Sequence, residues 1–187
     1  MIADFALVLA FGAASVFVIT YAILVLHELG HLVAARVLGL DADGFSAGAG
    51  PKVRFETAGG FSWSFGLIPV KGFISVEFSD VRWKNVMVIA AGPAVNAVLA
   101  VLALLAYLHL GYSFVVVLFM LSNFFAVIEN LLPRGNTDGR MIRDELRAWR
   151  SERRAVVGGT VSASAPAHAA EGAHALCREL YLRVGAR

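Results

Sequence analysis

The sequence predicts a membrane α-helical fold, with three transmembrane helices, a small membrane-associated β-sheet between the first two, and a short cytoplasmic helical tail. Three observations support this prediction. The 187 residues are 58% hydrophobic and 16% charged, a composition that departs from soluble proteins in the direction of membrane proteins. Three long runs contain no Asp, Glu, Lys or Arg. A Gly-rich stretch with alternating apolar residues separates the first run from the second.

Each of the three uncharged runs is long enough to cross a bilayer. They cover residues 5–26, 86–108 and 111–128, and a hydrocarbon core requires roughly 17–25 apolar residues per helix. A soluble chain of this length would have too little polar sequence to cover three such helices. With their flanking residues, we expect transmembrane helices at about 5–38, 86–108 and 111–132.

The positive charges indicate the orientation of these helices. All sixteen Lys and Arg residues lie in segments 36–84 and 134–187, which the positive-inside rule assigns to the cytoplasmic side. The N-terminus and the turn at 108–113 are then outside. We therefore expect a multi-pass integral membrane protein with a cytoplasmic tail at 141–187. The first run has no basic flank and is too long for the apolar part of a signal peptide, so we expect it to be retained.

The stretch at 44–78 is expected to form β-hairpins. It is rich in Gly, Phe, Val, Ile and Trp, and its short alternating runs are interrupted by glycines, which is typical of strands and turns. We expect strands at 52–57, 61–68 and 72–78. The apolar character favours a sheet that leans into the membrane over a cytoplasmic β-domain, and such backbone needs protein or water around it.

The tail combines a basic helix with a low-complexity linker. Residues 141–154 have apolar side chains on one side of a basic helix, which fits an interfacial helix on an anionic leaflet and also a solvated helix. A short helix is expected at about 173–185. Cys177 is the single cysteine, so the chain has no internal disulfide and no cysteine-based metal cluster.

The first uncharged run ends in three ionisable residues, His27, Glu28 and His31, which form the pattern H-E-x-x-H. Histidines four residues apart share a helix face, so both imidazoles can bind one zinc ion. Glu28 lies about a quarter turn from His27, where it can accept a proton from water activated by the metal. The pattern also fits core histidines, but uncompensated polar groups in lipid are costly. We therefore expect one Zn²⁺ per chain.

A catalytic zinc usually has three protein ligands and one open position. Glu129 and Asp138 both follow the third run, on the side of the two histidines, and local reasoning does not choose between them. In the second run, Gly92 permits close helix contact and Pro93 interrupts the hydrogen-bond ladder. Asn96 fits an interhelical hydrogen bond as well as a catalytic role.

Four sequence elements follow one another in a fixed order. They are His27-Glu28-x-x-His31, a β-region with Gly50-Pro51-Lys52 and Pro69-Val70-Lys71-Gly72, Gly92-Pro93-x-x-Asn96, and Asn130-x-x-Pro133 followed by Asp138-Gly139. Together, over about residues 15–140, they resemble the site-2 protease family of intramembrane zinc metalloproteases.

The resemblance implies roles for individual residues. It implies a protease core at 1–140, with His27, His31 and Asp138 as zinc ligands and Glu28 as the catalytic base. It also implies substrate-binding or supporting roles around the active site for Asn96, Gly92, Pro93, Asn130 and Pro133.

Two departures from the family pattern concern the loop around Asp138. Polar Asn136 and Thr137 precede Asp138 where the family commonly has an apolar residue, and Arg140 follows Gly139 where a small residue is frequent. The resemblance leaves the conformation of this loop unpredicted.

The implied function is that of a zinc-dependent intramembrane endopeptidase, which hydrolyses peptide bonds in or near transmembrane segments during regulated intramembrane proteolysis. Expected partners are a transmembrane protein substrate, the lipid bilayer, and a second copy or a regulatory membrane protein, but no nucleic acid. The turn at 108–113 and the short tail predict a minimal core without a PDZ or nucleotide-sensing domain. One alternative is a non-proteolytic, zinc-stabilised scaffold or inactive relative that binds transmembrane helices. Another is a prenyl-protein type of protease, whose third ligand would be a glutamate.

Overall fold

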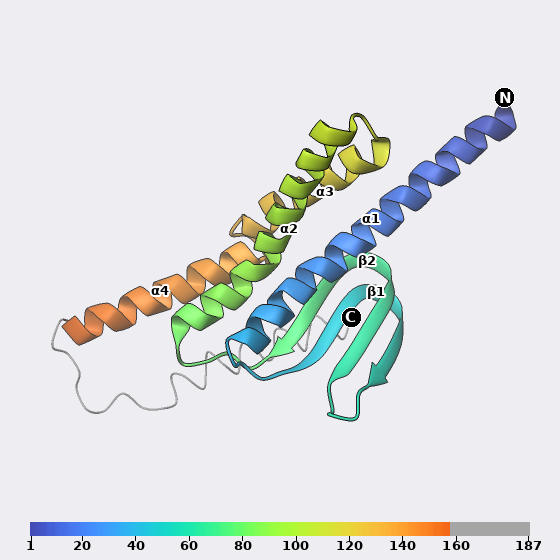
Figure 1. Cartoon of the computed structure of the whole chain (residues 1–187). Coiled ribbons are helices and arrows are strands. Elements are labelled where there is room, and N and C mark those ends of the chain that lie inside the picture. Colours follow the sequence, from blue (N-terminus) through green and yellow to red (C-terminus); the bar gives the residue numbers. More distant parts are fainter. Residues whose placement is uncertain (158–187) are drawn as a thin grey trace. The chain divides into compact units, whose positions relative to one another are not determined.

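The computed structural model describes residues 1–157. The helix predicted at about 173–185 and the rest of the tail from 158 onward lie outside the described residues. The chain divides into two compact units, Met1–Arg147 and Ala148–Arg187, and every residue of the predicted site lies in the first. The elements are α1 Ile2–Val37, β1 Ala42–Glu56, β2 Ser62–Val76, α2 Arg82–Leu110, α3 Phe114–Leu131 and α4 Asp138–Val157 (Figure 1).

Three of these helices are long and apolar enough to cross a membrane, at Ala3–Val37, Arg82–Leu110 and Phe114–Leu131. This confirms the number of predicted spans and their order along the chain. The third helix begins three residues later than its uncharged run. Gly111 ends α2 with a φ of 80°, a conformation that residues with a Cβ rarely adopt. The residues at 111–113 therefore form the turn between two helices.

The two strands pair antiparallel, and their bounds differ from the prediction. β2 is continuous from Ser62 to Val76, whereas the sequence predicts separate strands at 61–68 and 72–78. We expected strand structure in this first part only from residue 52, whereas β1 begins at Ala42. Its first part pairs on both sides, since Ala47 lies opposite Gly72 and also opposite Phe65. Hydrogen bonding from two neighbours keeps this Gly-rich stretch extended, although its local propensity is low.

The sheet packs against one side of α1, and α2 contacts another (Figure 1). The Tyr21 hydroxyl donates to the carbonyl oxygen of Gly66 at 2.9 Å, which fixes the sheet to α1 a few residues before His27. Part of this non-helical backbone is thus supported by protein. The cluster between α1 and the sheet has Leu32, Ala42, Phe45 and Ala47 at its centre, with Leu24, Val25, Leu29, Phe61, Trp63, Phe65, Ile74 and Val76 around them.

The helices α1 and α2 approach closely at Gly30. A Cβ on Gly30 would lie 2.8 Å from Cγ2 of Val95 and 2.9 Å from the carbonyl oxygen of Ala91, so only glycine allows this separation. The buried residues of α2 recur every three or four positions and form a stripe. This stripe consists of Asn85, Val88, Ile89, Gly92, Pro93, Asn96 and Ala103.

Candidate metal centre

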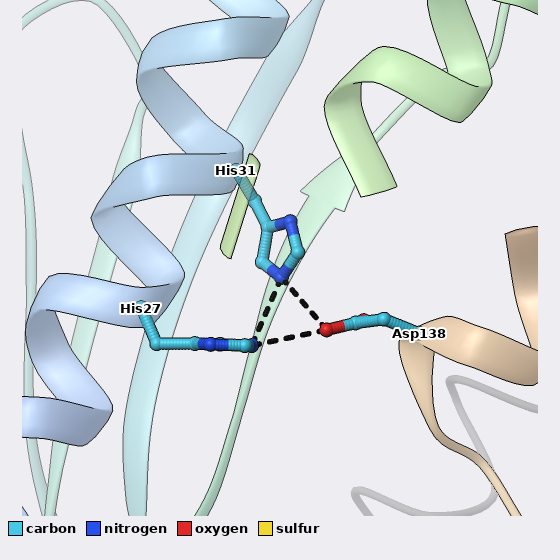
Figure 2. A group of neighbouring side chains, drawn as sticks. All are labelled: His27, His31 and Asp138. Carbon is cyan, nitrogen blue, oxygen red and sulfur yellow. Dashed lines mark hydrogen bonds and ion pairs between the residues drawn. The ribbon is translucent and has the colours of Figure 1, made fainter. Parts of the chain in front are cut away.

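Three side chains from two helices converge on one point. His27 and His31 come from α1, and Asp138 is the first residue of α4 (Figure 2). The two Nε2 atoms are 3.1 Å apart. Oδ2 of Asp138 lies 3.1 Å from Nε2 of His27 and 3.5 Å from Nε2 of His31. Both histidines are buried, and the Asp138 side chain is 15% exposed.

The triangle has the size that a zinc ion requires. Bonds of about 2.0–2.2 Å in tetrahedral geometry put neighbouring ligand atoms about 3.3–3.5 Å apart. Two imidazole nitrogens and a carboxylate oxygen are also a common donor set of catalytic zinc. Within residues 1–157, the buried Oδ2 of Asp138 has no hydrogen-bond partner. Coordination to a metal ion would satisfy this oxygen. The residues present therefore fit zinc.

The ring of His31 is held in a suitable tautomer by α2. Its Nδ1 lies 2.8 Å from the carbonyl oxygen of Val88. The backbone N of Gly92 also lies 3.3 Å from Nδ1, but the shorter contact is to a carbonyl oxygen, which accepts and does not donate, and it assigns the proton to Nδ1. The lone pair of Nε2 then points to the other two side chains. Such outer contacts orient histidine ligands and increase their basicity.

Asn96 fixes the orientation and tautomer of the His27 ring in the same way. Its side-chain amide lies 3.0 Å from Nδ1 of His27, and Asn96 is fully buried. With the amide nitrogen toward the ring, Oδ1 of Asn96 has no partner within residues 1–157. The opposite amide orientation lets Oδ1 accept the proton of Nδ1. It also leaves Nε2 of His27 available to a metal.

The substitution Asn96→Ala is expected to weaken zinc binding by roughly 10–100-fold, because the loss of an outer contact to a histidine ligand has this effect. Chelator competition on the purified chain measures the affinity. Asn123→Ala is the matched control, since Asn123 is also fully buried but donates to Phe119 of its own helix. Equal zinc affinity in the native chain and in Asn96→Ala would contradict this role.

Glu28 lies beside the triangle but is not part of it. It is 6% exposed and close enough to His31 and Asp138 to interact electrostatically with both. The backbone of β2 covers it, since a Cβ on Gly72 would lie 2.7 Å from Oε1 of Glu28. The strand thus confines the carboxylate next to the ligands.

Gly92 is the point at which α2 touches both imidazoles. A Cβ there would overlap Nε2 of His31 and lie 2.8 Å from Cε1 of His27. The residues alone identified Gly92 as a small residue for helix contact, and the family resemblance implied a supporting role around the active site without giving its contacts. Gly92 lies four residues before Asn96, and both belong to the buried stripe of α2 together with Pro93. This spacing is the sequence signal that could have placed Gly92 opposite the histidines.

Not every predicted residue reaches the centre. The amide of Asn130 donates to the carbonyl oxygen of Ala126 on its own helix at 2.9 Å, and Pro133 is exposed beyond the end of α3. Glu129 is also exposed. The structure therefore brings Asp138, and not Glu129, to the two histidines.

Thr137 and Arg140, which both depart from the family pattern, stabilise the loop before Asp138 by hydrogen bonds to its backbone. The Thr137 hydroxyl lies within hydrogen-bonding distance of the carbonyl oxygens of Leu132 and Arg134. Nη1 of Arg140 donates to the carbonyl oxygen of Gly135 at 2.9 Å. Sequence reasoning did not find these contacts, because both join a side chain to the backbone of a folded loop.

Asp138 itself begins a helix, whereas we expected it in a loop. A carboxylate in the first turn of a helix is stabilised by the helix dipole. Gly139 allows α4 to start directly against the end of α3, since a Cβ there would overlap the carbonyl group of Leu131. An ion pair of 3.2 Å between Arg82 and Glu145 joins α4 to α2.

Comparison with known proteins gives one family. The model of Peptidase family M50 matches residues 15–113, a range that includes His27, Glu28, His31 and Asn96 and ends before Asp138. Three similar proteins bear the name "Putative zinc metalloprotease". The one from Chlamydia pneumoniae is 32% identical over 116 residues, which cover 49% of this chain and 19% of that protein.

The other two are similar in extent. The protein from Chlamydia trachomatis serovar D is 29% identical over 103 residues, which are 42% of this chain and 17% of the relative. The protein from Clostridium perfringens is 30% identical over 93 residues, which are 43% of this chain and 28% of the relative. The matched region spans less than a third of each of these relatives.

Proposed function

Since this chain belongs to peptidase family M50, we propose that it is a zinc-dependent intramembrane endopeptidase that hydrolyses peptide bonds in or near transmembrane segments. The observation that carries the proposal is the triangle of His27, His31 and Asp138, whose edges measure 3.1 to 3.5 Å. It fits one zinc ion and stands beside a buried carboxylate. A structural zinc site has no need of such a base.

Each residue then has a defined task. A bound zinc ion supplies Lewis acidity, which lowers the pKa of water and polarises a carbonyl group. Glu28 accepts a proton from the attacking water and passes it to the leaving amine. Val88 and Asn96 hold the two imidazoles in the orientation that presents Nε2. Gly92 leaves the space that both rings occupy.

The setting of the site supports a substrate in the membrane. The histidines lie on a helix that is apolar enough to span the bilayer, and the sheet beside them packs on that helix. We place the N-terminus outside and the tail in the cytoplasm, on the basis of the Lys and Arg distribution. The partners are a transmembrane substrate, the bilayer, and a second copy or regulatory membrane protein.

A substrate helix must unwind before cleavage, because its carbonyl groups are engaged in internal hydrogen bonds. Residues 72–76 of β2 pair with β1 along one edge and begin at Gly72, which touches Glu28. The other edge can hold an extended segment of substrate by strand addition. This arrangement would bring an exposed peptide bond close to Glu28.

Proline substitutions, made one at a time at residues 73–75, are expected to slow cleavage and leave zinc content unchanged, because proline removes a donor from the strand. Cleavage of a reconstituted transmembrane substrate measures the effect. The same scan over 53–55, on the opposite side of the sheet, is the control for damage to the sheet. Unchanged cleavage at all three positions of 73–75 would exclude strand addition at this edge.

The proposed function is tested by comparing Asp138→Ala with Glu129→Ala. Asp138→Ala is expected to lose zinc and cleavage together, since it removes one of three ligands. Glu129→Ala is expected to keep both. Loss of zinc in Glu129→Ala alone would indicate the prenyl-protein type of site. A native chain that binds zinc and a transmembrane substrate without cleaving it would indicate a non-proteolytic scaffold.

A further inference from the structure

A basic cluster lies on the face of the sheet that points away from α1. Phe45 and Ala47 pack toward α1, so Ser46 between them faces the opposite way. Nζ of Lys52 donates to Oγ of Ser46 at 3.3 Å and lies 5.8 Å from the centre of the Phe73 ring. The amine of Lys52 is therefore on this face.

Arg54 joins Lys52 there. Arg54 follows Lys52 by two residues, so the two share a face, and Arg54 lies opposite Ser64 in the register. Burial, and after it the charges of Arg54 and Lys71, hold the pKa of the Lys52 amine below its usual range. Arg54 and Lys71 each lie close enough to act electrostatically on the Lys52 amine. In the described part of the chain, no ion pair joins Lys52 or Arg54 to a carboxylate.

The two cations can be reached from outside the protein, since Arg54 is exposed and Lys52 is partly exposed. Gly66 lies opposite Lys52, and Gly48 packs directly on the backbone of Gly66, so neither position presents a side chain. An anion with several oxygen atoms would neutralise Lys52 and Arg54.

An apolar groove adjoins the cluster. It has a volume of about 820 Å³ and lies between α1 and the bends of the two strands. Its lining includes Phe17, Tyr21 and Val25 from α1, and Val53 and Leu67 from the sheet. Lys52 also lines the groove. Its methylene chain therefore belongs to the groove, whereas its amine belongs to the cluster.

We propose that this chain binds an anionic phospholipid at this place, with the phosphate on Lys52 and Arg54 and an acyl chain in the groove. A ligand that uses both features must carry a negative head and an apolar tail. Free phosphate would use only the cluster, and an uncharged lipid would use only the groove. Neither ligand would explain why the amine of Lys52 belongs to the cluster and its methylene chain to the groove.

The test uses the full chain in detergent, incubated with equal amounts of phosphatidylglycerol and phosphatidylcholine of the same acyl composition. Native mass spectrometry counts the retained lipids. The native chain is expected to retain phosphatidylglycerol preferentially. Arg54→Gln is expected to reduce this retention roughly tenfold, the scale of one lost charged contact. Arg134→Gln removes a charge from an exposed arginine outside the cluster and is expected to have no effect.

A second variant distinguishes the lipid from free phosphate. Val53→Trp fills the groove and is expected to lower phosphatidylglycerol retention without changing zinc content. Unchanged retention in Val53→Trp, together with displacement of the lipid by inorganic phosphate, would show that the site binds phosphate alone. Equal retention of the two lipids by the native chain, or an equal loss in Arg134→Gln and Arg54→Gln, would overturn the proposal.

Discussion

The variant Glu28→Gln is expected to retain one zinc ion per chain. Its cleavage rate is expected to be at least roughly 10³-fold lower than that of the native chain, a factor within the range attributed to general acid–base catalysis. The amide has the shape of the carboxylate but cannot accept the proton of the attacking water. Glu28 is not one of the three converging ligands, so its substitution leaves the metal site complete. Zinc content by elemental analysis and cleavage of a reconstituted transmembrane substrate measure the two effects separately.

Glu129→Gln is the matched control, because Glu129 is exposed and outside the triangle. It is expected to retain both zinc and cleavage. Undiminished proteolysis by Glu28→Gln would refute the mechanism, whatever its zinc content. Loss of zinc in that variant would instead show that the Glu28 carboxylate helps to hold the metal.

The substitution Gly92→Ala is expected to lower zinc affinity by at least about 100-fold, since it displaces the ligands as well as their outer contacts. A single methyl group there would overlap Nε2 of His31 and lie 2.8 Å from Cε1 of His27. To accommodate it, α2 must move away from α1, which would also break the contacts of Val88 and Asn96 to the two rings.

Helix propensity alone predicts that Gly92→Ala stabilises α2. A loss of zinc affinity in this variant would therefore come from the packing of α2 on the ligands. Replacement of glycine by alanine within a helix normally stabilises it by about 1 kcal/mol. Gly12→Ala is the control, because no atom lies within 4 Å of a Cβ at that position of α1, and it is expected to retain zinc. Chelator competition measures both affinities. Native zinc affinity in Gly92→Ala would contradict the packing of α2 on the ligands.

Several features could be predicted from the sequence because each depends on nearby residues. The three spans follow from uncharged runs longer than the bilayer requires, and the structure confirms their number. The pairing of His27 with His31 follows from helix geometry, which puts residues four apart on one face. Their Nε2 atoms lie 3.1 Å apart.

Other features required the folded chain. The Gly-rich start of β1 has weak strand propensity, yet it is extended because Ala47 has a neighbour on each side. The loop around Asp138 departs from the family pattern, yet Thr137 and Arg140 close it through bonds to backbone carbonyls. Neither result could be obtained from local pattern, since both depend on which segments become neighbours.

The sequence by itself thus determined the membrane class, the number of spans and the two-histidine motif, because helix periodicity and apolar length act over a few neighbouring residues. The family resemblance implied that Asp138 is the carboxylate that joins the histidines, but only the tertiary structure decided what fixes their rings. Those contacts join residues separated by 57 and 69 positions, in the cases of His31 with Val88 and His27 with Asn96. Such contacts depend on the close packing of α1 on α2, which no local pattern encodes.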